Sequence, residues 1–571
     1  LPVQALVFWY FGLYRGIWRF ASIPDLLRIL RAVLFGTALT FVAMFVWQRL
    51  ESVPRSVLVL YPVILVLTLA APRMLYRWLK DHRLDLRSNE RKRALLIGAG
   101  RAGELLVRDL LKAGPYEPVG FLDDAERRQG QEIHGVRVIG GISALEKTVE
   151  KLGVEVVLLS MPSASHRVIH SVVEKCQQLD VPCRTLPSVA DLADGRVEVS
   201  SLRQVQIEDL LGRDVVQMDD APLQQLMLDK CILVTGAGGS IGSELCRQVM
   251  RYGPARLIMV DHGEFNLYRI EAEMRKRFPA DMVIVLLGDI RDETRMRWLF
   301  ETYSPQIIFN AAAYKHVPLV EENPAEGVKT NIFGTCQLAD MAVEFDAQKF
   351  VQISTDKAVN PANIMGATKR AAEIYCQNMN ARTAQTAFVT TRFGNVLGSA
   401  GSVVPLFREQ IEHGGPVTVT HPEMTRYFMT IPEAVSLILQ AGAMGEGGEI
   451  FVLDMGEPVR IADLAEQMIR LSGLTPGEDI EIVYTGLRPG EKLYEELFHA
   501  SESLKTTTHP QIMLSASRET DWDQLQSLLK KLRAACANRE LDQLKTALQE
   551  LVPEYGPEPA QSASSTGAVL H

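Results

Sequence analysis

Three consecutive side chains in the middle of the chain could move protons. Thr355, Asp356 and Lys357 follow the apolar run 350–353, which is typical of a buried strand. A hydroxyl, a carboxylate and an ammonium group at the end of a strand could act as general acid and general base. A second ammonium group, that of Lys369, follows in the sequence Met-Gly-Ala-Thr-Lys, which predicts the start of a helix. The corner between this strand and this helix therefore predicts acid–base chemistry.

A glycine-rich loop predicts the cofactor for that chemistry. The apolar run 231–235 is followed by the pattern T-G-x-x-G-x-x-G and then by a helical stretch. Such a loop lets a phosphate approach the backbone at a helix N-terminus. The next apolar run, 255–260, ends in Asp261, whose carboxylate would accept hydrogen bonds from the adenosine ribose and repel a 2′-phosphate. We therefore expect NAD as the cofactor, not NADP.

The ends of the later strands complete the predicted cofactor site. Asp289 could face the edge of the adenine, and the small residues after the run 307–310 would let the backbone approach the cofactor. Lys369 would hold the nicotinamide ribose. The residues predicted to bind NAD are Gly236, Gly239, Ser240, Ile241, Gly242, Asp261, Asp289, Ile290, Ala311, Ala312 and Lys369.

A second glycine pattern occurs earlier in the chain. The strand-like run 94–97 precedes G-x-G-x-x-G at Gly98–Gly103, and Asp123 and Asp124 end the next apolar run. This pattern predicts another nucleotide-binding-type fold, but no acid–base group accompanies it. We therefore favour a structural or regulatory role, with a second nucleotide at Gly98–Gly103 as the alternative.

Two long apolar runs near the start of the chain predict a transmembrane hairpin at about residues 30–49 and 54–72. Aromatic residues flank the runs, and arginines and lysines are concentrated before the first and after the second. By the positive-inside rule both ends of the hairpin face the cytoplasm. We therefore expect a multi-pass protein of the inner (cytoplasmic) membrane, in contact with the lipid bilayer, with its catalytic domains in the cytoplasm.

Composition sets the remaining limits. A chain of 571 residues is too long for one ordinary core. A net charge of −9 argues against a nucleic-acid-binding protein. Seven dispersed cysteines without a C-x-x-C pair predict neither a disulfide framework nor a metal site. We therefore expect no metal and no nucleic-acid partner.

The predicted fold class is α/β. Transmembrane helices precede two doubly wound parallel-sheet domains of the Rossmann type, and the second domain carries a smaller C-terminal substrate lobe. The predicted parts are a membrane region at 1–90, a first Rossmann-like domain at 91–215, a catalytic domain at 216–555 and a disordered tail at 556–571.

The motifs together resemble a known family. The T-G-x-x-G-x-x-G loop, Gly-Asp at 288–289, Asn-Ala-Ala-Ala at 310–313 and Lys369 look like an extended short-chain dehydrogenase/reductase, except that Met365 stands where that superfamily has a tyrosine. Ser-Thr-Asp-Lys followed by Asn-x-Met-Gly-Ala-Thr-Lys resembles one subgroup, the membrane-anchored nucleotide-sugar 4,6-dehydratases of polysaccharide biosynthesis. Those enzymes make UDP-4-keto-6-deoxy sugars from UDP-N-acetylglucosamine.

The resemblance implies a role for each group at the corner. Asp356 would be the acid for the departing C6 hydroxyl, Lys357 the base at C5, and Thr355 a hydrogen-bond donor to the C4 oxygen. Lys357 must lose its proton to act as a base, which desolvation or a neighbouring cation such as Lys315 could favour. Met365 can be neither acid nor base.

The resemblance also implies contacts to a UDP-sugar. Arginines suit a diphosphate because the guanidinium fork matches phosphate oxygens, although a surface salt bridge is the usual fate of an arginine. The predicted substrate-binding residues are Lys315, His316, Arg392, Asn395, Arg426, Arg488 and Glu491.

Two alternatives remain open at this point. A UDP-sugar epimerase uses the same fold and cofactor, but it normally needs the tyrosine that Met365 replaces. A non-catalytic membrane scaffold or redox sensor of a glycan-assembly complex would need neither Asp356 nor Lys357. In each case we expect a homo-oligomer.

Overall fold

The structure is a computed structural model that describes residues 2–11, 23–48, 54, 56–57, 60–72, 91–112, 114–161, 164, 166–186, 202–211, 218–498, 504–515 and 521–556. The basic segment 73–90 and the predicted tail after residue 556 lie outside these ranges. The chain divides into two compact units, residues 1–161 with 186–202 and residues 162–185 with 203–571. The domain boundaries predicted at residues 90 and 215 stay predictions.

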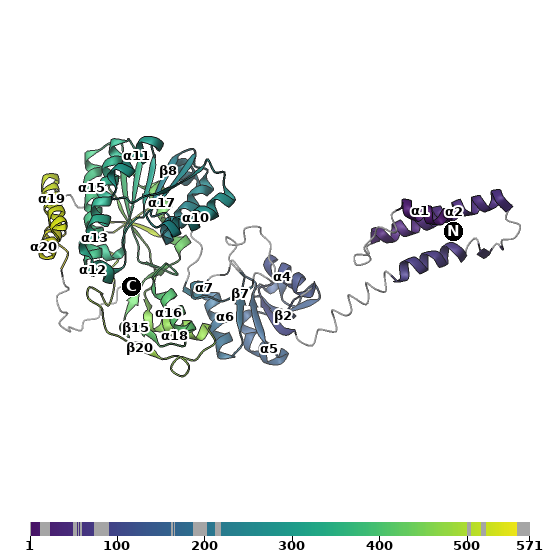
Figure 1. Cartoon of the computed structure of the whole chain (residues 1–571). Helices are drawn as coiled ribbons and strands as arrows, with labels where there is room; N and C mark the ends of the chain where they lie inside the picture. The colour runs from purple at the N-terminus through teal and green to yellow at the C-terminus, as the bar shows by residue number, and fades with distance from the viewer. Residues whose placement is uncertain are drawn as a thin grey trace. The chain divides into compact units, whose positions relative to one another are not determined.

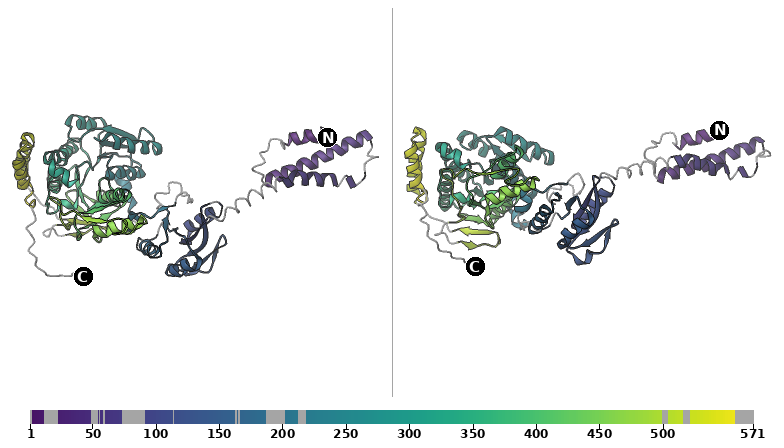
Figure 2. Two further views of the ribbon diagram at one scale, coloured as in Figure 1. Left: turned by 60° about the horizontal axis from the view of Figure 1, so that its bottom comes forward. Right: turned by 90° about the horizontal axis from the view of Figure 1, so that it is seen from below.

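Helices form the N-terminal part of the first unit (Figure 1): α1 (Pro2–Tyr10), α2 (Ile23–Gln48) and a shorter apolar helix, Leu60–Pro72. Phe8 and Val33 are buried in the small apolar core of this part. Figure 2 shows the helices side by side. The outer positions of α2 are also apolar; Phe35, Val42 and Phe45 are exposed.

The structure supports one of the two predicted membrane spans. Within α2, Ile29–Val46 is long and apolar enough to cross a membrane. In the second predicted span the structure describes an apolar helix at Leu60–Pro72 and helical residues at 56–57, and residues 58–59 lie outside the described ranges. Among the described residues, α2 alone meets the length of a span, so the hairpin and the multi-pass arrangement are not supported.

A mostly parallel sheet follows in the first unit. Its strands lie in the order β3-β4-β2-β1-β5, with β1 parallel to both β2 and β5 and with only β3–β4 antiparallel. Leu96, Phe121 and Leu158 are buried in its core. The elements are β1 (Lys92–Ile97), α4 (Arg101–Lys112), β2 (Tyr116–Leu122), η3 (Glu126–Arg128), β3 (Glu132–Ile133), β4 (Val136–Gly140), η4 (Ile142–Ala144), α5 (Leu145–Leu152) and β5 (Val156–Leu159).

The second unit is built on a nine-stranded sheet of order β10-β9-β8-β11-β12-β13-β18-β22-β21. The strands from β10 to β18 are parallel, and β22 and β21 extend the sheet antiparallel. The strands are β8 (Cys231–Thr235), β9 (Arg256–Asp261), β10 (Val283–Leu287), β11 (Ile307–Asn310), β12 (Lys349–Ile353), β13 (Ala387–Arg392), β18 (Ile450–Leu453), β21 (Lys505–Thr506) and β22 (Ile512–Ser515). The predicted doubly wound parallel sheet is confirmed.

Alternate side chains of the central strands enter two cores, one on each face of the sheet. Leu233 of β8 packs into one core, and its neighbours Ile232 and Val234 pack into the other. The first core is covered by α11 (Glu293–Tyr303), α14 (Thr335–Glu344) and α15 (Ile364–Arg382), and the second by α9 (Ser240–Val249), α10 (Glu264–Arg277) and α17 (Ile431–Met444). The order of the strands reverses between β8 and β11, so a cleft is expected at their carboxyl ends.

Smaller elements complete the second unit. The last two helices, α19 (Trp522–Asn538) and α20 (Leu541–Leu551), pack on the α15 side of the sheet. The lobe holds β14 (Asn395–Val396), α16 (Val403–Glu412), β15 (Val417–Val419), β16 (Thr425–Arg426), β17 (Phe428–Met429), β19 (Val459–Arg460), α18 (Ile461–Leu471) and β20 (Ile482–Tyr484). The others are α6 (His166–Gln178), β6 (Cys183–Thr185), β7 (Arg203–Gln204), α7 (Ile207–Leu211), α8 (Asp220–Met227), η6 (Met250–Tyr252), α12 (Val317–Glu322), α13 (Pro324–Val328), η7 (Lys329–Gly334) and η8 (Asp356–Ala358).

Candidate active site

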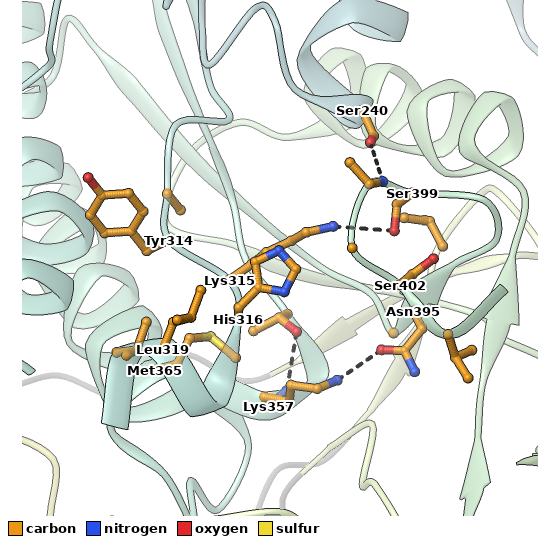
Figure 3. A pocket seen from close by; sticks show the side chains of 18 of the residues that line it. Ser240, Tyr314, Lys315, His316, Leu319, Lys357, Met365, Asn395, Ser399 and Ser402 are labelled. Carbon is orange, nitrogen blue, oxygen red and sulfur yellow. Dashed lines mark hydrogen bonds between the residues drawn. The ribbon is translucent and has the colours of Figure 1, made fainter. Parts of the chain in front are cut away.

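A pocket of about 810 Å³ lies in the second unit at the carboxyl ends of β8, β11, β12 and β13. Its walls come from the loops after these strands and from the C-terminal lobe (Figure 3). Seven of the predicted cofactor residues line it: Gly236, Gly239, Ser240, Ile241, Gly242, Ala311 and Lys369. The pocket therefore joins the glycine loop to the acid–base corner.

The glycine loop is packed so closely that larger residues would not fit. Gly236 has a φ of +64°, and a Cβ there would lie 2.8 Å from the backbone of Ala311. A Cβ on Gly242 would lie 2.0 Å from the carbonyl oxygen of Gly236. The loop leads into α9, whose first amides have no acceptor within the helix and line the pocket. This arrangement fits the diphosphate of a dinucleotide.

Four other predicted cofactor residues lie away from the lining of the pocket. The Asp261 carboxylate accepts the N–H groups of Gly238 (2.9 Å) and Gly263 (2.7 Å), so it holds the glycine loop in place. Asp289 forms an ion pair with Arg291. The side chain of Ile290 is buried in the core, and Ala312 packs against the same core. Contacts of these four residues to a cofactor stay predictions.

The acid–base corner is held by a network of short contacts. The Thr355 hydroxyl donates to Asp356 Oδ1 (2.8 Å), and Lys357 Nζ donates to the same oxygen (3.0 Å). Thr355 and Lys357 line the pocket, whereas the side chain of Asp356 is fully buried behind them. The second oxygen of Asp356, Oδ2, is buried without a hydrogen-bond partner among the described residues. The corner therefore brings together the three predicted groups.

The charge on Lys357 differs from the expectation. Burial lowers the pKa of this ammonium group, but the carboxylates of Asp356 and Glu495 outweigh it and raise the pKa above its ordinary value. Neither desolvation nor the positive charge of Lys315 therefore makes the neutral amine the favoured form of Lys357. The pKa of Lys315 itself is lowered by burial and by the positive charge of Lys357. The raised pKa favours the ammonium form of Lys357, whose Nζ lies 3.0 Å from Asp356 Oδ1.

Helix α15 supplies the other predicted groups. Lys369 Nζ donates to the carbonyl of Ile353 (2.9 Å), and burial lowers the pKa of Lys369 to about 8. Met365 is 2% exposed and lines the pocket next to Lys369. Asn331, in the π-helical turn η7, bonds to the backbone of Tyr314 and to Thr368, and so fixes the pocket wall to α15.

Several of the predicted substrate residues line the pocket. Lys315 Nζ donates to the hydroxyl of Ser399 (3.3 Å), and Lys357 Nζ donates to Asn395 Oδ1 (3.1 Å), as Figure 3 shows. His316 lines the same pocket, and its pKa is lowered mainly by burial and also by the charge of Lys315. These polar groups surround the space in front of the acid–base corner.

The prediction for Arg392 is wrong. Its side chain is 1% exposed and is not among the residues that line the pocket. The guanidinium donates to both oxygens of Glu373, at 2.8 and 2.6 Å. Arg370 and Ser354 bond to the same carboxylate, and these contacts lower the pKa of Glu373 to about 2 although burial raises it. Arg392 therefore binds Glu373 inside the protein and not the substrate.

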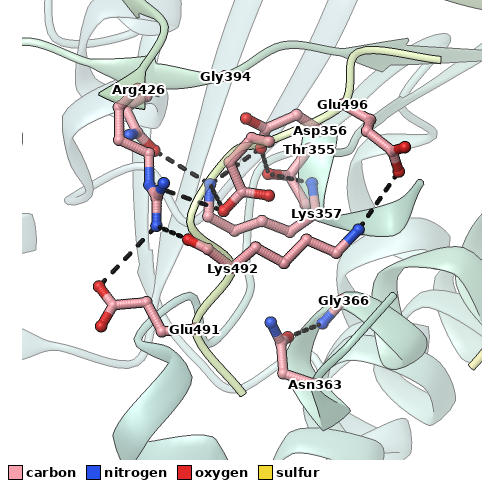
Figure 4. A network of polar contacts seen from close by, with 12 residues as sticks. Thr355, Asp356, Lys357, Asn363, Gly366, Gly394, Arg426, Glu491, Lys492 and Glu496 are labelled. Atoms are coloured by element: carbon pink, nitrogen blue, oxygen red, sulfur yellow. Dashed lines mark hydrogen bonds and ion pairs between the residues drawn. The ribbon is translucent and has the colours of Figure 1, made fainter. Parts of the chain in front are cut away.

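Two other arginines predicted to bind the substrate, Arg426 and Arg488, line the pocket but make different contacts. Arg426 lines the pocket, but its N–H groups donate to the carbonyls of Thr425, Leu493 and Lys492. Figure 4 shows how it thereby holds the segment that carries Lys492. Arg488 and Glu491 line the pocket at the turn before this segment, and the backbone N–H of Arg488 donates to Glu491 (3.2 Å). Arg488 therefore suits the phosphate better than Arg426.

The sequence did not single out Glu495. Its carboxylate is buried beside Lys357 and Arg426, at 3.7 Å from each. No strand or helix pattern marks the segment 488–498, so the sequence carries no signal for this contact.

In the first unit, groups of the protein itself occupy the carboxylate of Asp123, which ends the apolar run after the glycine pattern. Asp123 accepts hydrogen bonds from the backbone of Ala99 (2.7 Å) and Ala125 (2.8 Å) and from Arg128 (2.9 Å). Burial raises the pKa of Asp123, but these contacts outweigh it and lower the pKa overall. A second nucleotide at Gly98–Gly103 stays a prediction.

Comparisons with known proteins agree with this geometry. Residues 232–517 match the family described as polysaccharide biosynthesis protein, and residues 10–187 match the family described as CoA-binding domain. The capsular polysaccharide biosynthesis protein CapD of Staphylococcus aureus is 43% identical over 505 residues, 88% of this chain and 83% of that protein.

Two relatives that match about half of the chain are named as enzymes. A UDP-N-acetylglucosamine 4,6-dehydratase (inverting) of Campylobacter jejuni is 36% identical over 278 residues, 48% of this chain and 79% of that protein. A UDP-glucose 4-epimerase of Rickettsia rickettsii is 31% identical over 291 residues, 49% of this chain and 81% of that protein.

Proposed function

The chain belongs to the family of polysaccharide biosynthesis proteins, and from that premise we propose that it is an NAD-dependent nucleotide-sugar 4,6-dehydratase. One observation carries the proposal most directly. Thr355 and Lys357, both bonded to the buried Asp356, face a pocket that also contains the glycine loop and Met365. The substrate we propose is UDP-N-acetylglucosamine, and the product is a UDP-4-keto-6-deoxy sugar.

The glycine loop and Lys369 would hold the cofactor. The first amides of α9 suit its diphosphate, and the amine of Lys369 lies in the pocket wall where the nicotinamide ribose is expected. Bound NAD would accept a hydride from C4 of the sugar and later return it to C6. The remaining chemistry is proton transfer, and it belongs to the side chains of the corner.

The elimination needs a neutral Lys357 and a protonated Asp356. The C4 ketone acidifies the C5 proton, and Lys357 would take that proton. The C6–O bond breaks as a C5–C6 double bond forms, and the leaving hydroxyl takes a proton and departs as water. The 3.0 Å contact between Lys357 Nζ and Asp356 Oδ1 offers the route by which one proton converts the resting ion pair into the reactive pair.

The proton of Asp356 has a short path to the pocket. Because the Asp356 side chain is fully buried, we infer that the hydroxyl of Thr355, 2.8 Å from Asp356 Oδ1, relays the proton to the C6 hydroxyl. Oxidation of C4 would release the proton of its hydroxyl group to water, and after the elimination Lys357 is an ammonium group and Asp356 a carboxylate. When the hydride returns to C6, the Lys357 ammonium would give its proton to C5 and then recover one from water, which restores the ion pair that the structure holds. The sugar would be bound through its UDP by Arg488 and Glu491, with Lys315, His316 and Asn395 near the sugar.

The epimerase alternative is disfavoured by one residue. A superfamily member that only oxidises and reduces C4 would use a tyrosine where this chain has Met365, and a thioether cannot exchange protons. An epimerase also has no use for an acid at C6. A dehydratase needs the Asp356–Lys357 pair, so the pair supports dehydration.

We also propose that α2 attaches the enzyme to the cytoplasmic membrane, with the catalytic unit in the cytoplasm. The apolar outer face of α2 suits lipid, and Ile29–Val46 is long enough to span the bilayer. A second crossing by Leu60–Pro72 would need neighbouring residues to lengthen it. Mapping the accessibility of single cysteines placed at residues 50 and 91 would count the crossings, because one span puts the two positions on the same side.

Product analysis tests the proposed function. The full chain in detergent would be incubated with UDP-N-acetylglucosamine and NAD, and the nucleotide sugar would be weighed by mass spectrometry. We expect a product lighter by one water molecule. An isomer of unchanged mass would instead identify an epimerase, and recovery of the substrate alone would support the scaffold alternative.

A further inference from the structure

A buried carboxylate that the proposed function does not use lies beside the acid–base corner. Glu495 belongs to the C-terminal segment 488–498, and its side chain is 6% exposed. Its Oε1 lies 3.7 Å from Lys357 Nζ and 3.7 Å from Arg426 Nε. A carboxylate buried so deeply is costly unless cations compensate it. Lys357 and Arg426 are the cations that compensate the buried carboxylate of Glu495.

The groups around Lys357 come from several parts of the second unit. Asp356 accepts from it at 3.0 Å and Asn395, from β14, at 3.1 Å. Glu495 approaches from the C-terminal segment, and the cations of Arg426 and Lys315 face the same amine. Figure 4 shows Lys357 and Asp356 beside Arg426, which in turn bonds to the segment carrying Lys492.

We propose that Glu495 is a positioning residue of the reaction, which holds the amine of Lys357 at the pocket wall and sets the pH at which Lys357 becomes a base. The inference rests on the proposed role of Lys357 as the C5 base. Glu495 does not line the pocket, so it acts through Lys357 and not on the sugar.

Electrostatics gives the direction of the effect. The negative charges of Asp356 and Glu495 favour the ammonium form of Lys357, whereas burial and Arg426 oppose it. Burial and the charge of Asp356 raise the pKa of Glu495 itself, although Lys357 and Arg426 oppose this, so Glu495 exerts its full charge only above that raised pKa. An opposite charge within about 4–6 Å shifts a pKa by about 1–3 units. Removing the charge of Glu495 alone should therefore lower the pKa of Lys357 and enlarge the neutral fraction of its amine by about tenfold or more.

The test compares two neighbouring carboxylates in the full chain. E495Q removes the charge beside Lys357. E496Q is the matched control, because the Glu496 side chain is 51% exposed and bonds to Asn360 and Lys492 instead. A small amine-reactive reagent would be added at about pH 8, and the rate of Lys357 labelling would be read from peptides by mass spectrometry.

We expect Lys357 to be labelled about tenfold faster or more in E495Q than in the wild type, and at the wild-type rate in E496Q. The rising limb of the kcat–pH profile should move to lower pH in E495Q only. If Glu495 only supported the fold, E495Q would lower the yield of folded enzyme but leave the rising limb of the kcat–pH profile where it is in the wild type, and this would overturn the inference. Equal labelling of Lys357 in the wild type and E495Q, or the same acceleration in E496Q, overturns the inference.

A second variant covers the case in which E495Q does not fold. E495D keeps the charge but withdraws it by one methylene group, so Lys357 should be labelled at a rate above that of the wild type. A wild-type rate in E495D would overturn the inference. Labelling does not depend on turnover, so an inactive wild-type enzyme would refute the proposed function without deciding the role of Glu495.

Discussion

The buried carboxylate of Glu373 offers a sharp test of how the acid–base corner is supported. Glu373 lies on α15 and is fully buried. It binds Arg392 through both oxygens, Arg370 at 3.0 Å and the hydroxyl of Ser354 at 2.6 Å. Ser354 directly precedes the reactive triplet. Replacing Glu373 by Gln keeps the shape of the side chain but removes the carboxylate that Arg392 and Arg370 share, while Arg370 keeps its longer contact with Glu554 (3.6 Å).

Two estimates of the free energy of unfolding that E373Q loses agree. The pKa of Glu373 falls from 4.5 to about 2, a difference of about 2.5 units, which corresponds to about 3 kcal/mol. Breaking a buried ion pair by removing one partner typically costs about 3–5 kcal/mol. Since the pKa is lower in the folded state, this stabilisation is present above about pH 4.5 and is lost as the pH falls towards about 2.

Thermal unfolding of the catalytic unit in the full chain, in detergent, is the assay. We expect E373Q to lower Tm by roughly 5 °C or more at neutral pH, and the difference from the wild type to narrow towards about pH 3. E344Q is the control, because Glu344 pairs with Arg297 at an exposed position and should change Tm little. A Tm of E373Q within about 1 °C of the wild type would refute the assigned role of Glu373.

Four further substitutions probe the pocket itself. G236A should reduce NAD affinity by at least about tenfold in equilibrium binding, because a Cβ would lie 2.8 Å from the backbone of Ala311 at a φ of +64°; near-normal affinity would contradict the packing of the loop. R488A should raise KM for the UDP-sugar by about tenfold with little change in Tm. R426A should instead lower Tm, because Arg426 anchors the backbone of residues 492–493. Steady-state kinetics and thermal unfolding of both variants distinguish these effects, and the reverse pattern would show that Arg426 is the phosphate ligand. Lys369 should lose its proton as the pH rises through about 8, so NAD affinity should fall above that pH in the wild type but not in K369R; identical pH profiles in titration calorimetry would be inconsistent with a charged Lys369 at the cofactor.

The sheet of the catalytic unit was predictable because its strands are buried on both faces. The apolar runs at 231–235, 255–260 and 350–353 became β8, β9 and β12. The glycine loop and the Thr-Asp-Lys triplet follow such runs directly, so both were placed at the carboxyl edge of the sheet. That placement brought the cofactor loop and the acid–base corner into one pocket.

Contacts between distant charged residues were not predictable. Glu373 and Arg392 are separate in the sequence, and a charged residue on a helix is usually expected to face solvent. Helix α15 is buried along nearly its whole length, so periodicity did not reveal that Glu373 points inward. Glu495 lies in a segment without periodic pattern, and only the fold brings it to Lys357. The predicted second membrane span includes residues outside the described ranges, so it stays a prediction.

In the proposed reaction Lys357 removes the C5 proton, and Asp356, acting through Thr355, gives a proton to the C6 hydroxyl so that it leaves as water. The most direct measurement is the reaction of UDP-N-acetylglucosamine with the full chain and NAD in heavy water, followed by mass spectrometry and proton NMR of the product. The wild type should release a 4-keto-6-deoxy sugar that has lost water and gained one solvent deuteron at C5, and K357M and D356N should form almost none. A product of unchanged composition, or full activity in K357M, would contradict the account.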